Sequence, residues 1–201
     1  MADVKISGLP ASTTPLAGTE VLPIVQGGQT RQVSVDNLTA GRPISASTVR
    51  ATTTMGVGAA TPSTSGAGIT FPATQSASTD ANTLDDYEEG NWTPAIAVNT
   101  GTATTYTIGT SYYTKVGRLV TVNGAITPTN GTLGSTNSYI RISGLPFLPL
   151  GLVSTGSGLN ASNYNNGIAV CMAYSSNVID AAFVTGCASN NQWSFSVTYI
   201  V

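Results

Sequence analysis

The clearest hydrophobic pattern lies near the C-terminal end, where every odd position from Trp193 to Val201 is apolar or aromatic and most even positions are polar. Alternation with a period of two is typical of a strand with one face in the core. Similar runs occur at 120–126, 139–142 and 168–174. Asn-Gly turn signals occur at 123–124, 130–131 and 166–167. Without any amphipathic helical pattern, this part of the chain, 91–201, is predicted to be an all-β antiparallel sandwich or jelly-roll-like knob.

Residues 1–40 show short apolar runs that are separated by Pro and Gly. The runs at 21–26 and 29–35 flank Gly27 and Gly28, which predicts a β-hairpin. A module of this size buries too little apolar surface to be stable alone. We therefore expect it to be an anchor that docks onto another protein or onto its own copies. The residues predicted to make this contact are Ile6, Leu9, Pro10, Val21, Pro23, Val25 and Val33.

Residues 41–90 are dominated by small polar residues. No charged residue occurs between Arg50 and Asp80, and Ala, Ser, Thr and Gly fill 27 of the positions 41–80. A solvated linker normally carries charge, and the apolar residues here are too sparse to pack against one another within one chain. The segment is therefore predicted to be an extended stalk that intertwines with copies of itself. The predicted contacts between copies are Val57, Ile69 and Phe71.

Charge limits the classes of partner. The chain has seven Lys and Arg, nine Asp and Glu, no His and a net charge of −2. Scattered basic residues form no phosphate-binding stripe, so we expect no nucleic-acid partner. No run of 18 apolar residues and no basic amphipathic helix is present, so we expect no membrane association. The first residues lack the apolar core of a secretory signal, which predicts synthesis and retention in a cytoplasm.

Candidate chemistry is sparse. The absence of His removes the commonest general base and most metal sites. The Ser- and Gly-rich run 151–158 lacks the Gly-x-Ser-x-Gly spacing of a nucleophile and is predicted to be a plain loop. Cys171 and Cys187 are expected to be buried thiols rather than a disulfide, because synthesis is expected in a reducing compartment. We therefore expect no enzymatic activity, no cofactor and no bound metal.

An acidic cluster follows the stalk: Asp85, Asp86, Glu88 and Glu89. One interpretation is a site for a hard cation such as Ca²⁺. The favoured interpretation is a solvated junction between stalk and knob, because the interleaved Gly and Asn of a calcium loop are missing. A pair of carboxylates could also cleave a glycan, but outside the cluster the knob offers only Asp180.

Aromatic residues amid many Asn, Ser and Thr side chains suit a sugar or receptor contact. The residues considered for this role are Tyr112, Tyr113, Tyr164, Tyr139 and Trp92, and the first three are the predicted receptor contacts. The alternative is that about half of the aromatic residues face the core, as alternation predicts for Trp193, Phe195 and Tyr199.

Several stretches resemble a known class of proteins. Lys5–Thr14 (KISGLPASTT) and Gly18–Val33 (GTEVLPIVQGGQTRQV) resemble the opening module of tailed-bacteriophage fibre and exterior virion proteins. The stretches that resemble the shaft-to-head junction and β-knob of such proteins are Gly68–Ser78, Leu84–Pro94, Tyr113–Val120 and Ile142–Phe147. The resemblance implies a noncatalytic, typically trimeric virion protein with its N-terminus on the particle and its C-terminal knob outward.

Together, these observations predict a short homotrimeric fibre on the virion exterior, assembled in the host cytoplasm. Its predicted parts are the anchor (1–40), the stalk (41–90) and the knob (91–201). Other tail or capsid proteins are the expected partners, and a host-surface glycan is a candidate ligand. A chain of 201 residues is too short for a long host-recognising shaft or a depolymerase β-helix. The alternatives are a decoration trimer that stabilises the head shell and, less favoured, a glycan-cleaving tailspike that uses Asp85 or Glu88.

Overall fold

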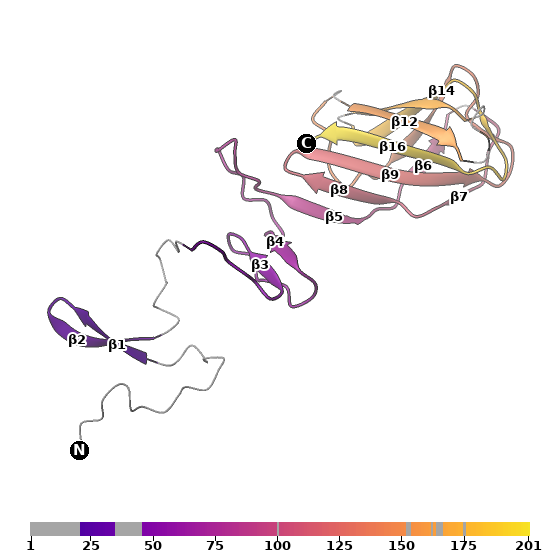
Figure 1. The fold of residues 1–201 in the computed structure, drawn as a ribbon. Coiled ribbons are helices and arrows are strands. Elements are labelled where there is room, and N and C mark those ends of the chain that lie inside the picture. Colours follow the sequence, from indigo (N-terminus) through magenta and orange to yellow (C-terminus); the bar gives the residue numbers. More distant parts are fainter. Residues whose placement is uncertain are drawn as a thin grey trace. The chain divides into compact units, whose positions relative to one another are not determined.

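The computed structural model describes residues 21–34, 46–99, 101–151, 154–161, 163, 167–174 and 176–201. Contacts divide the chain into two units, Met1–Arg50 and Ala51–Val201. All regular elements of the described residues are β-strands, which confirms the all-β prediction (Figure 1). None of these residues belongs to a helix long and apolar enough to cross a bilayer. Four predicted site residues lie outside the described residues: Ile6, Leu9, Pro10 and Tyr164.

The first unit contains the predicted hairpin. Strands β1 (Val21–Gln26) and β2 (Gln29–Ser34) pair antiparallel, with Gln26 opposite Gln29. Gly27 and Gly28 have φ of 60° and 74°, as a two-residue turn of type I′ requires. The hairpin prediction is therefore confirmed. Of the predicted anchor residues, Val21, Pro23 and Val25 are exposed and Val33 is partly buried.

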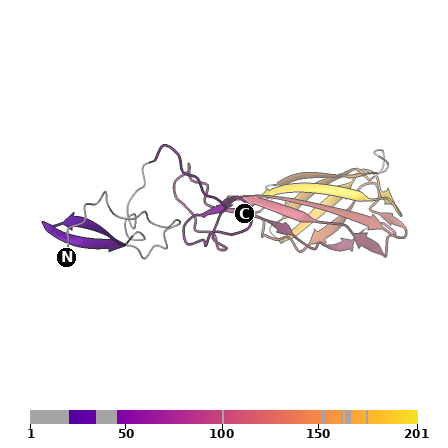
Figure 2. The ribbon, with the colours of Figure 1, turned by 60° about the horizontal axis from the view of Figure 1, so that its bottom comes forward.

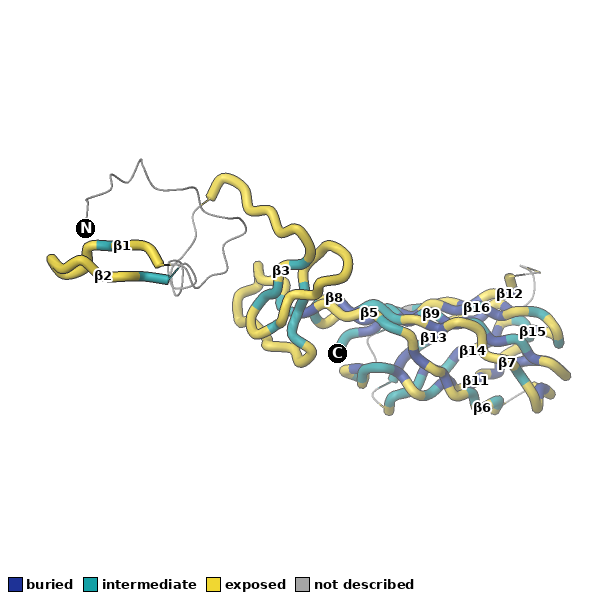
Figure 3. Tube along the Cα trace, turned by 90° about the horizontal axis from the view of Figure 1, so that it is seen from below, coloured by how far each residue is buried: buried dark blue, intermediate teal, exposed yellow. Residues whose placement is uncertain are grey.

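Within the predicted stalk, the chain does not run fully extended. Strands β3 (Thr54–Gly56) and β4 (Gly68–Thr70) pair in parallel, and Thr70 Oγ1 donates to Thr54 Oγ1 over 3.0 Å. The backbone N–H and C=O groups of these strands are paired within one chain, so they do not need the partners that neighbouring copies would supply to an extended stalk. Figure 3 shows that the residues around this pair are mostly exposed. The intertwining of copies stays a prediction.

The second unit also contains one sheet of ten strands, in which every pair is antiparallel. In spatial order the strands are β5 (Tyr87–Asn91), β8 (Tyr112–Val116), β9 (Leu119–Pro128), β16 (Trp193–Ile200), β12 (Ser154–Asn160), β13 (Ala169–Tyr174), β14 (Val178–Phe183), β11 (Ser138–Ser143) and β6 (Ala95–Val98). The tenth strand, β7 (Tyr106–Ile108), pairs with β9 beside β8. A separate short pair joins β10 (Thr132–Leu133) to β15 (Cys187–Ala188).

This sheet curls so that its two halves face each other (Figure 2). The predicted sandwich is thus one continuous curled sheet rather than two separate sheets. One cluster of buried residues fills the space between the halves. It includes Val120, Val122, Ile126, Trp193, Val197 and Tyr199 from one half and Ile140, Ile142, Ile179 and Ala181 from the other. The alternation predicted for the last strand is confirmed, because Trp193, Phe195, Val197 and Tyr199 are all buried.

Two local predictions are wrong for a common reason. Asn123-Gly124 lies inside β9 instead of in a turn, and the Ser- and Gly-rich run expected to be a loop largely forms β12. Gly124 lies under the ring of Phe195, where an added Cβ would come within 2.6 Å of Cζ. Gly158 lies in the same way beneath Trp193. These strands use Gly because a neighbouring strand supplies the large ring, so no hydrophobic pattern marks them.

Candidate functional site

Four of the stretches that carry the fibre-protein resemblance meet in one place, which we call the junction cluster. It consists of Gln75, Asp86, Tyr113, Lys115 and Phe147, one or two residues from each stretch. Asp86 directly precedes β5, and Tyr113 and Lys115 lie on the inward face of β8. The loop after β11 contributes Phe147. The cluster therefore connects the end of the predicted stalk to the large sheet.

A buried ion pair lies at the centre of the junction cluster. Lys115 Nζ contacts Asp86 Oδ2, and the two side chains are only 5% and 8% exposed. Nζ also lies 5.5 Å from the centroid of the Phe147 ring and 3.5 Å from Gln75 Oε1. A buried ammonium group requires such partners, because it has lost its hydration. The pair fixes β8 to the chain that enters β5.

Tyr113 extends the cluster toward the edge of the sheet. Its hydroxyl donates to Glu88 Oε1 over 2.5 Å, and its ring meets the Phe147 ring edge-on at 5.5 Å. The hydrogen bond to Glu88, together with burial, raises the pKa of Tyr113 to about 12. The ring covers Gly90, its cross-strand partner, which has no side chain to compete for that space. Tyr113 is therefore a packing residue as well as a surface one.

The acidic cluster is divided among separate partners. Asp85 accepts hydrogen bonds from the Ser78 backbone N–H (2.8 Å) and from Gln75, and the first of these lowers the pKa of Asp85 below its usual value. Glu89 accepts from the Tyr87 hydroxyl. The described residues include no group of three or more His, Cys, Asp or Glu side chains that could hold a metal ion. This arrangement fits the junction interpretation of the cluster.

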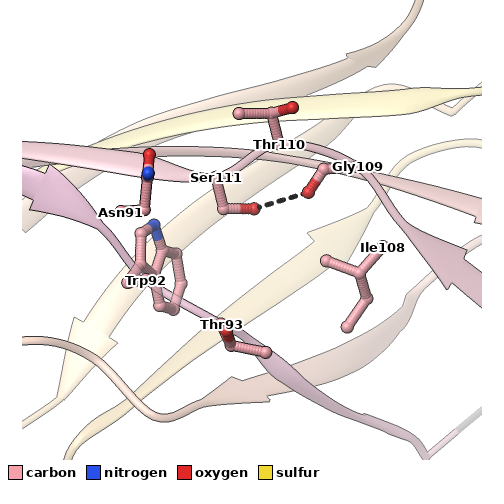
Figure 4. A pocket seen from close by; sticks show the side chains of 7 residues that line it. All are labelled: Asn91, Trp92, Thr93, Ile108, Gly109, Thr110 and Ser111. Atoms are coloured by element: carbon pink, nitrogen blue, oxygen red, sulfur yellow. Dashed lines mark hydrogen bonds between the residues drawn. The ribbon is translucent and has the colours of Figure 1, made fainter.

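Two depressions lie at the end of β5. The first, of about 300 Å³, is lined by Asn91, Trp92, Thr93 and residues 108–111. The buried residues of this lining are Trp92 and Ser111, and Figure 4 shows the Ser111 hydroxyl donating to the Gly109 carbonyl. The second, of about 290 Å³, is lined by 89–91 and 112–114. Because Asn91 lines both, we treat them as one groove, the Asn91 groove.

The outer-face row of residues that contains Tyr112 is uncharged. On the outer face, Tyr112 has Asn91 and Asn123 as its cross-strand neighbours, so an exposed ring lies between two amide side chains. Tyr112 is 51% exposed. The next row across the same face contains Glu89, Thr114, Thr121 and Thr198. Such a surface can stack one face of a ligand and exchange neutral hydrogen bonds with its edges.

The structure separates the predicted receptor residues. Tyr112 faces outward at the groove, whereas Tyr113 is half-buried, packs against Phe147 of the junction cluster and donates its hydroxyl to Glu88. Trp92 is buried, packs against Phe195 and donates to the Asn123 carbonyl, so the idea of Trp92 as a surface platform is wrong. Asn91 was not predicted, because no sequence signal distinguishes it from the many other Asn residues.

The predicted stalk contacts also differ from one another. Val57 and Phe71 are partly buried and line a common depression of about 180 Å³ with residues 76, 78 and 83–85. The Phe71 ring also lies 6.4 Å from the Tyr87 ring. Ile69 is 53% exposed and pairs across the strands with Met55, which is also exposed. Among the three predicted contacts, only Ile69 is largely free for a neighbouring copy.

Both cysteines are free thiols in the buried core of the second unit. Burial raises the pKa of Cys171 to about 12 and that of Cys187 to about 11. A thiol with so high a pKa is a poor nucleophile and a poor metal ligand. Neither cysteine therefore adds reactive chemistry to the junction cluster or to the Asn91 groove.

No protein-family model matches the chain, and no curated protein shows significant similarity to it.

Proposed function

We propose that this chain is a noncatalytic structural protein of a tailed-bacteriophage virion: a short homotrimeric exterior fibre that is anchored by its N-terminal module. The observation that carries the proposal is the junction cluster. Four of the six stretches that resemble fibre proteins contribute one or two residues each to a single network around the buried Lys115. A network that joins a low-complexity segment to a β-sheet is what a shaft-to-head junction requires.

The arrangement of acids supports a noncatalytic role. Glycan cleavage needs two carboxyl groups that face one substrate across a short gap. Here Asp86 is paired with Lys115, and Glu88 accepts from Tyr113. Asp85, the other acid considered for a tailspike, is occupied by the Ser78 backbone and Gln75. The acids of the cluster thus serve structural partners.

Exposed apolar residues support assembly into a homotrimer. Tyr87, Val116 and Leu119 are successive cross-strand neighbours on the outer face of the sheet, at the end beside the junction cluster, and all three are exposed. Association of copies would cover this row and Ile69, and apolar burial would stabilise the assembly. Light scattering of the purified chain should give three times the chain mass of 20.4 kDa; a monomeric mass would contradict the trimer.

The N-terminal hairpin supports attachment to another protein. An isolated two-stranded hairpin is marginal in water. Val21 and Val25 lie on one face of this hairpin and are both exposed. In the proposal, these side chains are covered by a tail or capsid protein of the particle.

Antibody-gold labelling of intact particles, with an antibody raised against 91–201, tests the proposal. Gold at one pole would indicate a tail fibre, and gold spread over the shell would indicate a head fibre or the alternative decoration trimer. Particles without gold, from a preparation in which the antibody detects the unassembled chain, would contradict the virion role. Heat and salt stability of particles lacking the protein would then separate decoration from fibre.

A further inference from the structure

We propose that the Asn91 groove binds a neutral saccharide, with the Tyr112 ring stacked on one sugar ring and the Asn91 amide hydrogen-bonded to its neighbour. This specifies the ligand class for the exposed face of the proposed fibre and in that sense rests on the proposed function.

The polar groups of the groove are available. Within the described residues, the side chains of Asn91, Thr93 and Thr110 make no hydrogen bond to other protein groups, and all three are exposed. The donors below them are already occupied: Trp92 Nε1 donates to Asn123, and Ser111 donates within its own loop. The donors of the buried lining residues are therefore satisfied, while the exposed lining residues offer one amide and two hydroxyl groups. Those are the groups that pair with sugar hydroxyls.

The aromatic ring gives the groove its orientation. Tyr112 lies between Asn91 and Asn123 on the outer face and makes no described ring contact with another aromatic residue. A tyrosine that presents a rigid apolar face beside polar groups loses little side-chain entropy on binding. Since the C–H face of a pyranose is apolar and its edge is hydroxylated, the ring and the flanking amides match both surfaces.

The charge of the lining residues favours neutral sugars over acidic ones. Among the described residues, no Lys or Arg lines either depression. Lys115 is buried with Asp86, and Arg118 Nε donates to the Val201 carbonyl. The only charged lining residue is Glu89, an acid, which would repel a sialic or uronic acid at short range. Two contiguous depressions of this size match consecutive rings of a short oligosaccharide, near the lower limit of about 300 Å³ for a ligand site.

The test uses the purified full-length chain on a printed array of defined oligosaccharides. Neutral hexose and N-acetylhexosamine chains are compared with sialylated and uronic-acid chains, and the strongest neutral binder is then titrated calorimetrically. We expect binding confined to neutral chains. Tyr112→Ala and Asn91→Ala should each weaken it at least about tenfold, whereas Tyr112→Phe should retain it. The matched control is Tyr139→Ala, an exposed tyrosine on β11, which should leave it unchanged.

Several outcomes would overturn the inference. These are an empty array with folded protein, a preference for acidic sugars, or equal binding by parent and Tyr112→Ala. Unchanged thermal unfolding of each variant shows that a loss of binding is local. The array and the gold labelling fail independently. If gold labels the particle but no sugar on the array is bound, the saccharide site is overturned and the proposed function stands. If the groove binds a sugar but no particle is labelled, the proposed function is overturned and the saccharide site stands.

Discussion

Replacing Lys115 with Met should destabilise the second unit by about 3–5 kcal/mol. The substitution preserves most of the apolar stem but removes the ammonium group that contacts Asp86. The Asp86 carboxylate then stays in a site where its side chain is 8% exposed, without its cation. Measurements on other proteins place the penalty for such a stranded charge at about 3–5 kcal/mol. For a unit of this size, that corresponds to a fall in Tm of roughly 6–20 °C.

A second substitution should recover most of this loss. In Lys115→Met with Asp86→Leu both charges are gone, and replacement of a whole buried pair by apolar side chains is often neutral or better. The coupling energy between the two sites should therefore be at least about 2 kcal/mol. Arg141→Met is the matched control, because its ion pair with Asp180 lies on the same sheet but the two side chains are 44% and 15% exposed. That variant should lose less than about 1 kcal/mol.

Urea unfolding, followed by the fluorescence of the buried Trp92 and Trp193, is measured for Lys115→Met, for Asp86→Leu, for their combination and for Arg141→Met. Each is compared with the parent at one protein concentration, because assembly would otherwise shift the apparent stability. A free energy of unfolding for Lys115→Met within about 1 kcal/mol of the parent value would contradict the predicted role of the buried ion pair. So would losses of stability that simply add in the double substitution, because the buried pair would then not hold the junction cluster together.

Three further predictions concern the stalk, the junction and the thiols. Ile69→Asp should abolish trimer formation in light scattering without lowering the unfolding temperature of the isolated chain. Phe71→Asp should both abolish trimer formation and lower that unfolding temperature. An equal fall in unfolding temperature for the two variants would contradict this difference. NMR titration should give Asp85 a pKa below the usual value of an Asp side chain, because the Ser78 backbone N–H donates to its carboxylate; its stabilising contribution is then present above the unfolded pKa and is lost as pH falls through the lower folded pKa, and an unshifted or raised pKa would contradict this. Cys171 and Cys187 should resist a thiol reagent at pH 8 until the chain is unfolded, and rapid labelling of the native protein would contradict their burial.

The sequence predicted those elements whose signal is local. The last strand follows from alternation alone, and the hairpin at Gly27 and Gly28 follows from its turn residues, because each needs no knowledge of a distant partner. Strand β12 could not be predicted in this way. Gly156 and Gly158 face Val197 and Trp193 of β16, so the apolar side chains of that contact belong to the other strand.

The candidate site was predictable only in part. Alternation along β8 does place Tyr112 and Tyr113 on opposite faces, but it does not say which face is buried. The partnership of Lys115 with Asp86 spans 29 positions and depends on the pairing of β5 with β8. The polar neighbours of Trp92 in the sequence favour a surface position, but its ring packs against Phe195. Tertiary contacts decided each of these cases.

Strand β8 links the two surfaces on which the proposals rest. Its inward side chains, Tyr113 and Lys115, belong to the junction cluster, and its outward side chain Tyr112 lies beside the Asn91 groove. A period of two thus lets one strand bind the incoming chain on one face and present a ligand surface on the other. The buried ion pair joins this strand to Asp86, the residue directly before β5. In the proposed fibre, a force on a sugar in the groove would pass through this ion pair toward the stalk.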